Sequence, residues 1–303
     1  MSSVKQPADA LLNGRVIAHL GKALIIEDED GNISRCHKRT QLEQPAVGDN
    51  VLWLKTEKEA GRVEQVLPRH SLLSRPSKRG DTRPVAANID QIVVILAVKP
   101  NIDALLLDQY LVVCENQDLT PLIVLNKCDL LDEESTLTTQ SIIDDYHQLG
   151  YDVLKTSAIK NSDLAALKKQ LHNKVSLLVG QSGVGKSSII NALLPDLSLQ
   201  TKTLSNASGL GKHTTTATTL YKLPDGGDIL DSPGVNIFGL ANISEFALAD
   251  GYREIKQFAS QCKYSNCIHI KEPKCEIKTQ LEKGNISENR YRRYLKLREK
   301  LNY

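Results

Sequence analysis

Residues 175–188 hold the pattern that most restricts what this chain can fold into. An apolar run from Val175 to Val179 predicts a buried strand that ends at Gly180. The next residues, G-Q-S-G-V-G-K-S, match the phosphate-binding loop G-x-x-x-x-G-K-[ST] at every fixed position. An ordinary glycine-rich strand-to-helix turn is the alternative, but the strand before the loop and the helical pattern after it favour a nucleotide phosphate site.

Each position of this loop has an expected role. Backbone N–H groups and the positive end of the following helix attract phosphate oxygens. Lys186 is expected to reach the β- and γ-phosphates and to assist catalysis, and the Ser187 hydroxyl is expected to ligate Mg²⁺. The residues expected to contact the phosphates are Gly180, Gln181, Ser182, Gly183, Val184, Gly185, Lys186, Ser187 and Ser188.

Length and charge exclude some classes of protein. The chain has 303 residues, enough for two or three domains, and its formal net charge of +2 shows that it is not a polycation. The N-terminus lacks the apolar stretch of a secretory signal, and the longest apolar run, Ile92 to Val98, is too short to span a bilayer. We therefore expect a cytoplasmic protein without membrane contact, and we expect a monomer.

The N-terminal region is expected to form a small barrel. Five short strands alternate with turn formers: 15–20, 22–27, 33–37, 50–55 and 62–67. This pattern favours an OB-type barrel, which commonly binds RNA or single strands, although other five-stranded barrels would have a similar sequence pattern.

Several features of this region are compatible with nucleic-acid binding. His37-Lys38-Arg39 and Trp53 can contact nucleic acid, or they can be a solvated charge cluster and a core tryptophan. Residues 68–84 form a predicted linker with five Lys/Arg against one Asp. Such a linker can be a soluble spacer, but beside a barrel of this kind phosphate contact is the better interpretation.

From Asn88 the pattern changes to strands that alternate with helices. Strands are expected at 92–98, 121–125 and 153–156, and helices at 103–116, within 132–149 and at 162–171. This alternation predicts a parallel α/β sheet with helices on both faces.

A guanine-recognition pattern precedes the phosphate loop. The strand that ends at Leu125 is followed by Asn126-Lys127-Cys128-Asp129, the N-K-x-D pattern of GTP-binding proteins. The Asp129 carboxylate can accept from N1–H and the N2 amine of guanine, whereas adenine would leave it unpaired. The next strand ends in Thr156-Ser157-Ala158, where the backbone N–H groups of Ser157 and Ala158 are expected to meet guanine O6.

The later GTPase motifs follow the phosphate loop, so the order is rotated. Residues 211–216, G-K-H-T-T-T, correspond to switch I, and residues 231–234, D-S-P-G, correspond to switch II with Gly234 as a nucleotide contact. The usual order begins with the phosphate loop, whereas here the base-recognition motifs come first. The chain is therefore predicted to contain a circularly permuted G domain.

Two residues of the switches carry expected chemistry. Thr215, with Thr214 as the second choice, is expected to complete the Mg²⁺ shell with Ser187 and Asp231. Val235 stands where many GTPases have a glutamine that orients water, so His213 is the candidate for that catalytic role. A packing or RNA-contacting role is the alternative for His213.

The C-terminal region contains metal-ligand chemistry. Cys262, Cys267, His269 and Cys275 lie within fourteen residues, which matches a closed structural Cys₃His zinc site. Coincidental reduced cysteines are the alternative. Residues 287–301 predict a helix with six Lys/Arg against two Glu, which is either a solvated face or, with residues 68–84, a second basic patch for RNA.

Together, the permuted GTPase motifs, the barrel before them and the C-x4-C-x-H-x5-C pattern after them resemble one family. The chain resembles the bacterial small-ribosomal-subunit-dependent GTPases (RsgA, also called YjeQ), including stretches such as 44–49 (Q-P-A-V-G-D) and 83–91. The resemblance covers nearly the whole chain.

The resemblance implies a multidomain α/β protein with an OB barrel, a permuted G domain and a small, mostly helical zinc domain. The expected boundaries are 1–75, 76–240 and 241–303. It also implies a GTPase that acts late in maturation of the small ribosomal subunit, contacts its rRNA and is stimulated by it. An RNA-binding assembly factor with a mainly structural, slowly hydrolysed GTP is the alternative.

Overall fold

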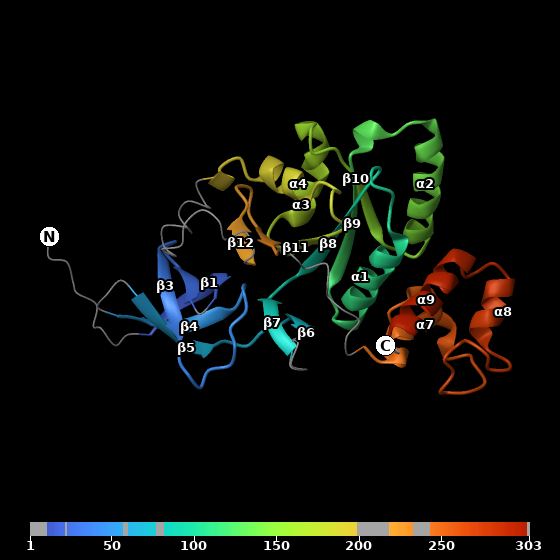
Figure 1. Cartoon of the computed structure of the whole chain (residues 1–303), viewed down its shortest axis with the longest axis horizontal. Helices are drawn as coiled ribbons and strands as arrows, with labels where there is room; N and C mark the ends of the chain where they lie inside the picture. The colour runs from blue at the N-terminus through green and yellow to red at the C-terminus, as the bar shows by residue number, and fades with distance from the viewer. Residues whose placement is uncertain are drawn as a thin grey trace. The chain divides into compact units, whose positions relative to one another are not determined.

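The computed structural model describes residues 11–21, 23–56, 60–76, 82–198, 218–232 and 243–301. The chain forms two compact units. The first contains residues 1–90, 168–178 and 190–237, and the second contains residues 91–167, 179–189 and 238–303. In Figure 1 the N-terminal strands are blue, the strands and helices around residues 91–155 are green, and the C-terminal helices are orange to red.

The first unit contains a closed barrel of five strands. Its strands are β1 (Leu12–Leu20), β2 (Ala23–Asp28), β3 (Ile33–Lys38), β4 (Asn50–Lys55) and β5 (Ala60–Val66). Hydrogen-bonded neighbours follow the order β1-β2-β3-β5-β4, and β4 pairs back to β1. All of these pairs are antiparallel except β3–β5. The predicted OB-type barrel is confirmed.

Trp53 fills the barrel interior. Only 1% of its surface is exposed, and its Nε1 donates to the carbonyl oxygen of Asn13 at 3.3 Å. A Cβ atom added at Gly14 or Gly61 would lie within 2.8 Å of its ring. The barrel therefore closes on this side chain because two glycines make room for it. The core interpretation of Trp53 is confirmed, and a nucleic-acid contact through its ring is excluded.

The described residues of 68–84, which exclude 77–81, contain regular structure that the predicted linker lacked. Here β6 (Leu72–Pro76) pairs antiparallel with β7 (Thr82–Ala87) to form a two-stranded sheet. Arg69 bonds the buried Asp49 through Nε and Nη2, at 2.6 and 2.7 Å. The predicted linker therefore includes two paired strands and an internal ion pair of Arg69, while phosphate contact by its other basic residues stays a prediction.

Three further strands lie in the first unit, apart from the last residue of one of them, Val179. β11 (Val175–Val179) lies parallel to β13 (Asp228–Asp231), and β12 (Thr219–Lys222) lies antiparallel to β13. β12 also pairs with the barrel through Ala18 and Thr219. β11 has the predicted bounds, and residues 176–179 are buried, as expected for an apolar strand inside a sheet.

The second unit contains a parallel sheet of three strands. β9 (Thr120–Asn126) lies between β8 (Gln91–Ala97) and β10 (Asp152–Lys155), and all seven residues of β8 are buried. The connecting helices are α1 (Ala104–Asn116), α2 (Glu133–Gln148) and α3 (Ala165–Leu171), with single 3₁₀ turns at Cys128–Leu130 and Asn161–Leu164.

Local sequence sets where the two longer helices begin. Asp103 accepts a hydrogen bond from the N–H of Leu106 at 3.0 Å and caps α1. Asp132 and Ser135 form a reciprocal capping box at the start of α2. These caps fix the points at which the chain leaves the carboxyl ends of β8 and β9, which is where parallel sheets bind ligands.

The C-terminal part of the second unit is helical. It contains α6 (Glu245–Asp250), α7 (Arg253–Ala259), α8 (Glu276–Glu282) and α9 (Glu288–Leu301), while α4 (Lys186–Leu193) follows the phosphate loop. Buried side chains of these C-terminal helices form one hydrophobic cluster, which also includes Val112 of α1. The cluster attaches the C-terminal helices to the helix that follows β8.

A buried ion cluster reinforces this attachment. Arg290 of α9 is 1% exposed; it pairs with Asp108 of α1 and bonds both carboxylate oxygens of Glu254 at 2.7 and 3.1 Å. Arg293 and the Tyr146 hydroxyl also bond Asp108, at 2.5 and 2.6 Å. Burial alone lowers the pKa of Arg290, but the carboxylates of Asp108 and Glu254 outweigh it and raise the pKa, so the guanidinium stays charged.

Only part of the predicted basic face of α9 is therefore available to bind an external anion. Arg290, Arg293 and Arg298 point into ion pairs with Asp108, Glu254 and Glu245. The exposed cations of the helix are Arg292, Lys296 and Lys300.

Among the described residues, no helix is long and apolar enough to cross a membrane.

We expect Arg290→Met to lower the free energy of unfolding by about 3–5 kcal/mol, because it leaves a buried carboxylate without its cation. Arg292→Met is the matched control, since Arg292 is exposed and pairs only with Glu288 one turn away, so its loss should cost less than about 1 kcal/mol. Urea unfolding followed by circular dichroism measures both. Equal midpoints for the two variants would show that the buried cluster does not stabilise the fold.

Candidate functional site

The phosphate loop joins β11 to α4 with the backbone that its glycines permit. Gly180, Gly183 and Gly185 have φ values of 144°, 80° and 96°, a region that side-chain-bearing residues rarely adopt. A Cβ atom at Gly180 would lie 2.2 Å from the carbonyl oxygen of Ile95. Glycine at the first loop position is therefore required by both conformation and space.

Lys186 begins α4 and reaches back over the loop. Its Nζ donates to the carbonyl oxygens of Gly180 and Gln181 at 2.6 and 2.8 Å. The ammonium therefore already lies beside the concave backbone where phosphate oxygens are expected. Ser182, Ser187 and Ser188 are exposed, so their hydroxyls can reach a ligand.

Asn126 connects the base-recognition segment to the phosphate loop. It is the last residue of β9 and is 1% exposed. Its Nδ2 donates to the carbonyl oxygen of Val184 at 2.9 Å, and its Oδ1 accepts from the N–H of Ala158 at 3.1 Å. One buried amide thus holds together three segments that are far apart in the sequence.

Lys127 makes a second connection of the same kind. Its backbone is left-handed, with a φ of 60°, and its Nζ donates to the carbonyl oxygens of Gly183 and Lys99 at 2.7 and 2.9 Å. The side-chain stem therefore runs from the base-recognition segment to the phosphate loop. An aliphatic stem in this position can lie against a purine ring.

Asp129 is the group expected to select guanine. It is exposed, and its Oδ1 accepts a hydrogen bond from the Ser157 hydroxyl at 2.5 Å. The Cys128 N–H donates to the Thr156 carbonyl oxygen at 3.1 Å, which fixes the two segments to each other. The structure thus brings residues 126–129, 156–158 and 180–186 together at one end of the β8–β10 strands.

The other residues expected in the nucleotide site are not among those that the structure brings together at this end of the strands. Asp231 ends β13 in the first unit and is half-buried. Five residues of the two switches lie outside the described residues: His213, Thr214, Thr215, Gly234 and Val235. The magnesium and water-orienting roles assigned to these residues remain predictions.

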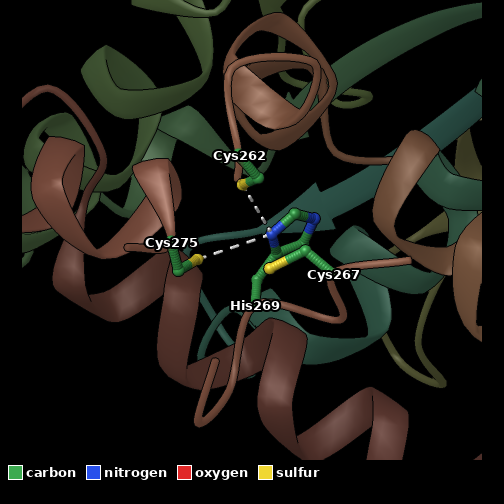
Figure 2. A group of neighbouring side chains, drawn as sticks. All are labelled: Cys262, Cys267, His269 and Cys275. Carbon is green, nitrogen blue, oxygen red and sulfur yellow. Dashed lines mark hydrogen bonds between the residues drawn. The ribbon is translucent and has the colours of Figure 1, made fainter. Parts of the chain in front are cut away.

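A second candidate site is the cluster of Cys262, Cys267, His269 and Cys275, shown in Figure 2. The three Sγ atoms and one imidazole nitrogen lie within 4.8 Å of one another. The His269 Nδ1 is 3.6 Å from the Sγ atoms of both Cys262 and Cys275. Ligand atoms of a tetrahedral zinc site, with bonds of about 2.0–2.3 Å, lie about 3.5 Å apart. The cluster can therefore hold a metal ion, and the residues present fit zinc.

Burial controls the protonation of these ligands. Burial raises the pKa of the Cys267 thiol to about 12, raises the pKa of Cys275 and lowers the pKa of His269, so without metal these two cysteines favour the thiol form and His269 the neutral imidazole. A neutral imidazole is the form that binds metal, whereas each thiol must lose its proton. Metal binding should therefore release protons and weaken as pH falls.

The sequence did not indicate every residue that shapes these two sites. Glu272, which lies between two of the cluster residues, accepts hydrogen bonds from their connecting loop, and Asp108 holds the C-terminal helix. The spacing of Arg290, Tyr294 and Leu297 on one helical face was a signal that Arg290 would be buried with them. No comparable pattern marks Glu272, because its partners are backbone groups.

Comparison with known proteins gives matches over nearly all of the chain. The family described as RsgA GTPase matches residues 66–241. The small ribosomal subunit biogenesis GTPase RsgA 1 of Vibrio vulnificus is 41% identical over 293 residues, which is 95% of this chain and 83% of that protein. The small ribosomal subunit biogenesis GTPase RsgA of Pseudomonas aeruginosa is 41% identical over 93% of this chain and 83% of its own length.

Two solved structures are similar along their full length. YjeQ from Thermotoga maritima has a TM-score of 0.78 and 33% identity, covering 96% of this chain and 99% of that chain. YloQ, described as a circularly permuted GTPase, has a TM-score of 0.76 and 28% identity, covering 99% of this chain and 98% of that chain. The circular permutation predicted for this chain is therefore also described for a similar solved structure, YloQ.

We expect Asp129→Asn to weaken GTP binding at least about tenfold and to strengthen binding of xanthosine triphosphate. The asparagine amide can donate to the C2 carbonyl of xanthine, whereas it cannot accept both guanine donors. Asp152→Asn is the control, because Asp152 is an exposed aspartate at the start of β10. Competition binding measures each affinity, and wild-type protein that binds ATP as tightly as GTP would contradict the guanine assignment.

Proposed function

The chain belongs to the RsgA GTPase family, and we propose that it hydrolyses GTP to GDP and phosphate in late maturation of the small ribosomal subunit. We further propose that it acts in the cytoplasm as a monomer. The observation that carries the GTPase assignment is the Asn126 amide, which joins the phosphate loop to both base-recognition segments. A glycine-rich turn without a nucleotide would not need that junction.

We propose that the base is held by the side chains that meet at this junction. The Asp129 carboxylate accepts from the guanine N1–H and N2 amine, and the Ser157 hydroxyl keeps that carboxylate in place. The Lys127 stem lies along the ring, and the O6 edge faces the backbone N–H groups of Ser157 and Ala158, of which the Ala158 N–H is shared with Asn126 Oδ1. Cys128 contributes its backbone, whose N–H is fixed by Thr156.

The phosphates are expected to lie in the loop from Gly180 to Ser188. Lys186 would exchange its two backbone carbonyl contacts for β- and γ-phosphate oxygens, which places its charge beside the oxygens that gain negative charge as the γ-phosphoryl group is transferred from the GDP leaving group to water. When Mg²⁺ is bound, it supplies further neutralisation of that charge. Its proposed protein ligands are Ser187, Thr215 and Asp231, while Gly234 contacts the γ-phosphate and His213 orients the attacking water.

We propose that Cys262, Cys267, His269 and Cys275 hold one structural zinc ion. All four positions are protein ligands, so no open position is left for catalysis. Among the described residues of 260–275, which run from the end of α7 to the start of α8, there is no helix or strand. A metal ion can hold such a segment in place of a core.

RNA contact is the third part of the proposal. We propose the three-domain division at 1–75, 76–240 and 241–303, in which the barrel precedes the GTPase motifs along the sequence and the metal-binding helices follow them. Barrel residues His37 and Arg39 are exposed. The exposed cations of α9 are Arg292, Lys296 and Lys300. None of them bonds the carboxylates that hold Arg69, Arg290, Arg293 and Arg298, and within the described residues the only ion pairs among them are Arg39 with Glu64 and Arg292 with Glu288, so they are the better candidates for rRNA phosphates.

Hydrolysis is tested by multiple-turnover phosphate release from GTP, with and without purified small subunits. We expect subunits to raise the turnover of the wild-type chain. His213→Ala should keep nucleotide affinity and lower turnover by about 100-fold or more if His213 acts on the water. Lys186→Ala is the contrasting variant, because it should weaken nucleotide binding itself.

Two outcomes of that assay would change the proposal. Wild-type protein that binds GTP and subunits without repeated turnover would favour an RNA-binding assembly factor whose GTP is structural. Unchanged turnover in His213→Ala together with weakened subunit binding would place His213 at the RNA interface.

The zinc proposal predicts one zinc per chain in freshly purified, reduced protein. Cys267→Ser should lose that zinc and loosen the C-terminal helices, whereas Cys36→Ala, which removes a thiol of the barrel, should keep it. Elemental analysis measures the metal. A zinc content near zero in reduced wild-type protein would contradict the assignment.

A further inference from the structure

The ligand loop, residues 268–271, contains a backbone that no regular element stabilises. It connects Cys267 to Glu272 and carries His269, and none of its residues belongs to a helix or strand. Backbone N–H and C=O groups in such a partly buried segment need hydrogen-bond partners. The partners that the structure gives them come from a few side chains.

One carboxylate supplies the acceptors for this loop. The Glu272 Oε1 accepts from the N–H of Ile268 at 3.0 Å, and its Oε2 accepts from the N–H groups of Ile270 and Lys271 at 2.8 and 3.0 Å. Burial alone would raise the pKa of Glu272, but these backbone hydrogen bonds outweigh it and lower the pKa to about 2. The carboxylate is therefore ionised throughout the neutral pH range.

The geometry that the carboxylate holds is an unfavourable one. His269 has a φ of 62°, in the left-handed region that costs energy for a residue with a side chain. The N–H groups on both sides of His269, from Ile268 and Ile270, converge on Glu272. The carboxylate therefore closes the turn that directs the His269 imidazole toward Cys262 and Cys275 (Figure 2).

Two hydroxyls of α9 hold the opposite side of the same turn. The Tyr291 hydroxyl donates to the carbonyl oxygen of His269 at 2.6 Å, and the Tyr294 hydroxyl donates to that of Ile268 at 3.0 Å. Glu272 thus fixes the N–H groups of Ile268, Ile270 and Lys271, and α9 fixes the carbonyl groups of Ile268 and His269. Neither tyrosine can replace the carboxylate, because each donates its hydroxyl hydrogen to a carbonyl.

We propose that Glu272 is the positioning residue of the metal site, and that its carboxylate preorganises the ligand loop so that His269 is in place before the metal binds. This inference rests on the zinc assignment of the previous section. Glu272 itself is outside the set of clustered ligand atoms, since both of its oxygens accept from backbone N–H groups. Without it, the loop must be ordered when the metal binds, and residues that orient ligands in this way typically contribute about 10- to 100-fold to metal affinity.

The test compares two glutamates that carry the same charge. Glu272→Gln replaces one acceptor oxygen by an NH₂ group, which cannot accept a backbone N–H. Glu276→Gln is the matched control, because Glu276 lies next to the ligand Cys275 but bonds Gln280 within α8 rather than the loop. Zn²⁺ affinity of the reduced full chain is measured by competition with a chromophoric chelator. We expect Glu272→Gln to bind Zn²⁺ about 10- to 100-fold more weakly, and Glu276→Gln to match the wild type within about threefold.

Glu272→Asp separates geometry from charge, and it keeps the test decisive if the glutamine variant folds poorly. It retains the negative charge, but the shorter side chain cannot reach both ends of the loop, so it should also bind Zn²⁺ more weakly than the wild type. GDP affinity and circular dichroism verify that each variant is folded. Wild-type affinity in Glu272→Asp, or equal losses in Glu272→Gln and Glu276→Gln, would overturn the positioning role and leave only a charge effect.

Co²⁺ provides a second readout. At saturating Co²⁺, the thiolate and d–d absorption bands of Glu272→Gln should have the wild-type shape, because the four ligands are unchanged. A changed spectrum would overturn the proposal by identifying Glu272 as a ligand. If the wild-type chain binds neither Zn²⁺ nor Co²⁺, it is the zinc assignment that fails, and this outcome is distinct from one in which all of these proteins bind metal equally well.

Discussion

The packing of the second unit depends on one carboxylate at the centre of a buried ion cluster, that of Asp108 in α1. A carboxylate with no exposed surface is costly unless cations and hydrogen-bond donors surround it, and here Arg290, Arg293 and Tyr146 all bond it. Two of these donors come from α9, more than 180 positions along the chain. The charge therefore forces the last helix of the chain to pack on the helix that follows the first strand of the parallel sheet. Hydrophobic contacts around Val112 add free energy to this packing, but the ion cluster gives it a single geometry.

The candidate nucleotide site is held together mainly by side chains that bond backbone groups, with one hydrogen bond between side chains, from Ser157 to Asp129. Asn126 and Lys127 donate to carbonyl oxygens of the phosphate loop, and Ala158 donates to Asn126. Such contacts depend on where each strand ends, because parallel strands deliver their carboxyl ends to one edge of the sheet. The hydrogen bonds between these segments do not depend on the order of the strands in the sequence. A circular permutation can therefore leave the recognition chemistry intact while it changes which segments follow the switches.

The metal-binding loop and the ion cluster share α9. Tyr291 and Tyr294 fix the carbonyl groups of the ligand loop, while Arg290 and Arg293 of the same helix bond Asp108. The four residues are neighbours along one helix, so the position of the loop and the packing on α1 are set together. Glu272 completes the loop from the other side. The C-terminal helices therefore belong to the same compact unit as the β8–β10 strands, which contains residues 91–167, 179–189 and 238–303.

The sequence by itself determined the features that arise from residues close together in the chain. The phosphate loop, the N-K-x-D segment and the Cys₃His pattern each depend on local spacing, and the strands of the barrel and of the parallel sheet follow from short apolar patterns bounded by turn formers. What the sequence could not determine is which charged side chains become internal. Arg69 and Arg293 have the same local pattern as solvated cations, the helical spacing of Arg290 indicates its burial but not its partners, and the contact of Glu272 with three backbone N–H groups has no sequence signature. Only the tertiary structure decided these roles, because the energy of a buried charge depends on partners that packing brings together. Some of these partners lie in the same loop, and others are more than 180 residues away in the sequence.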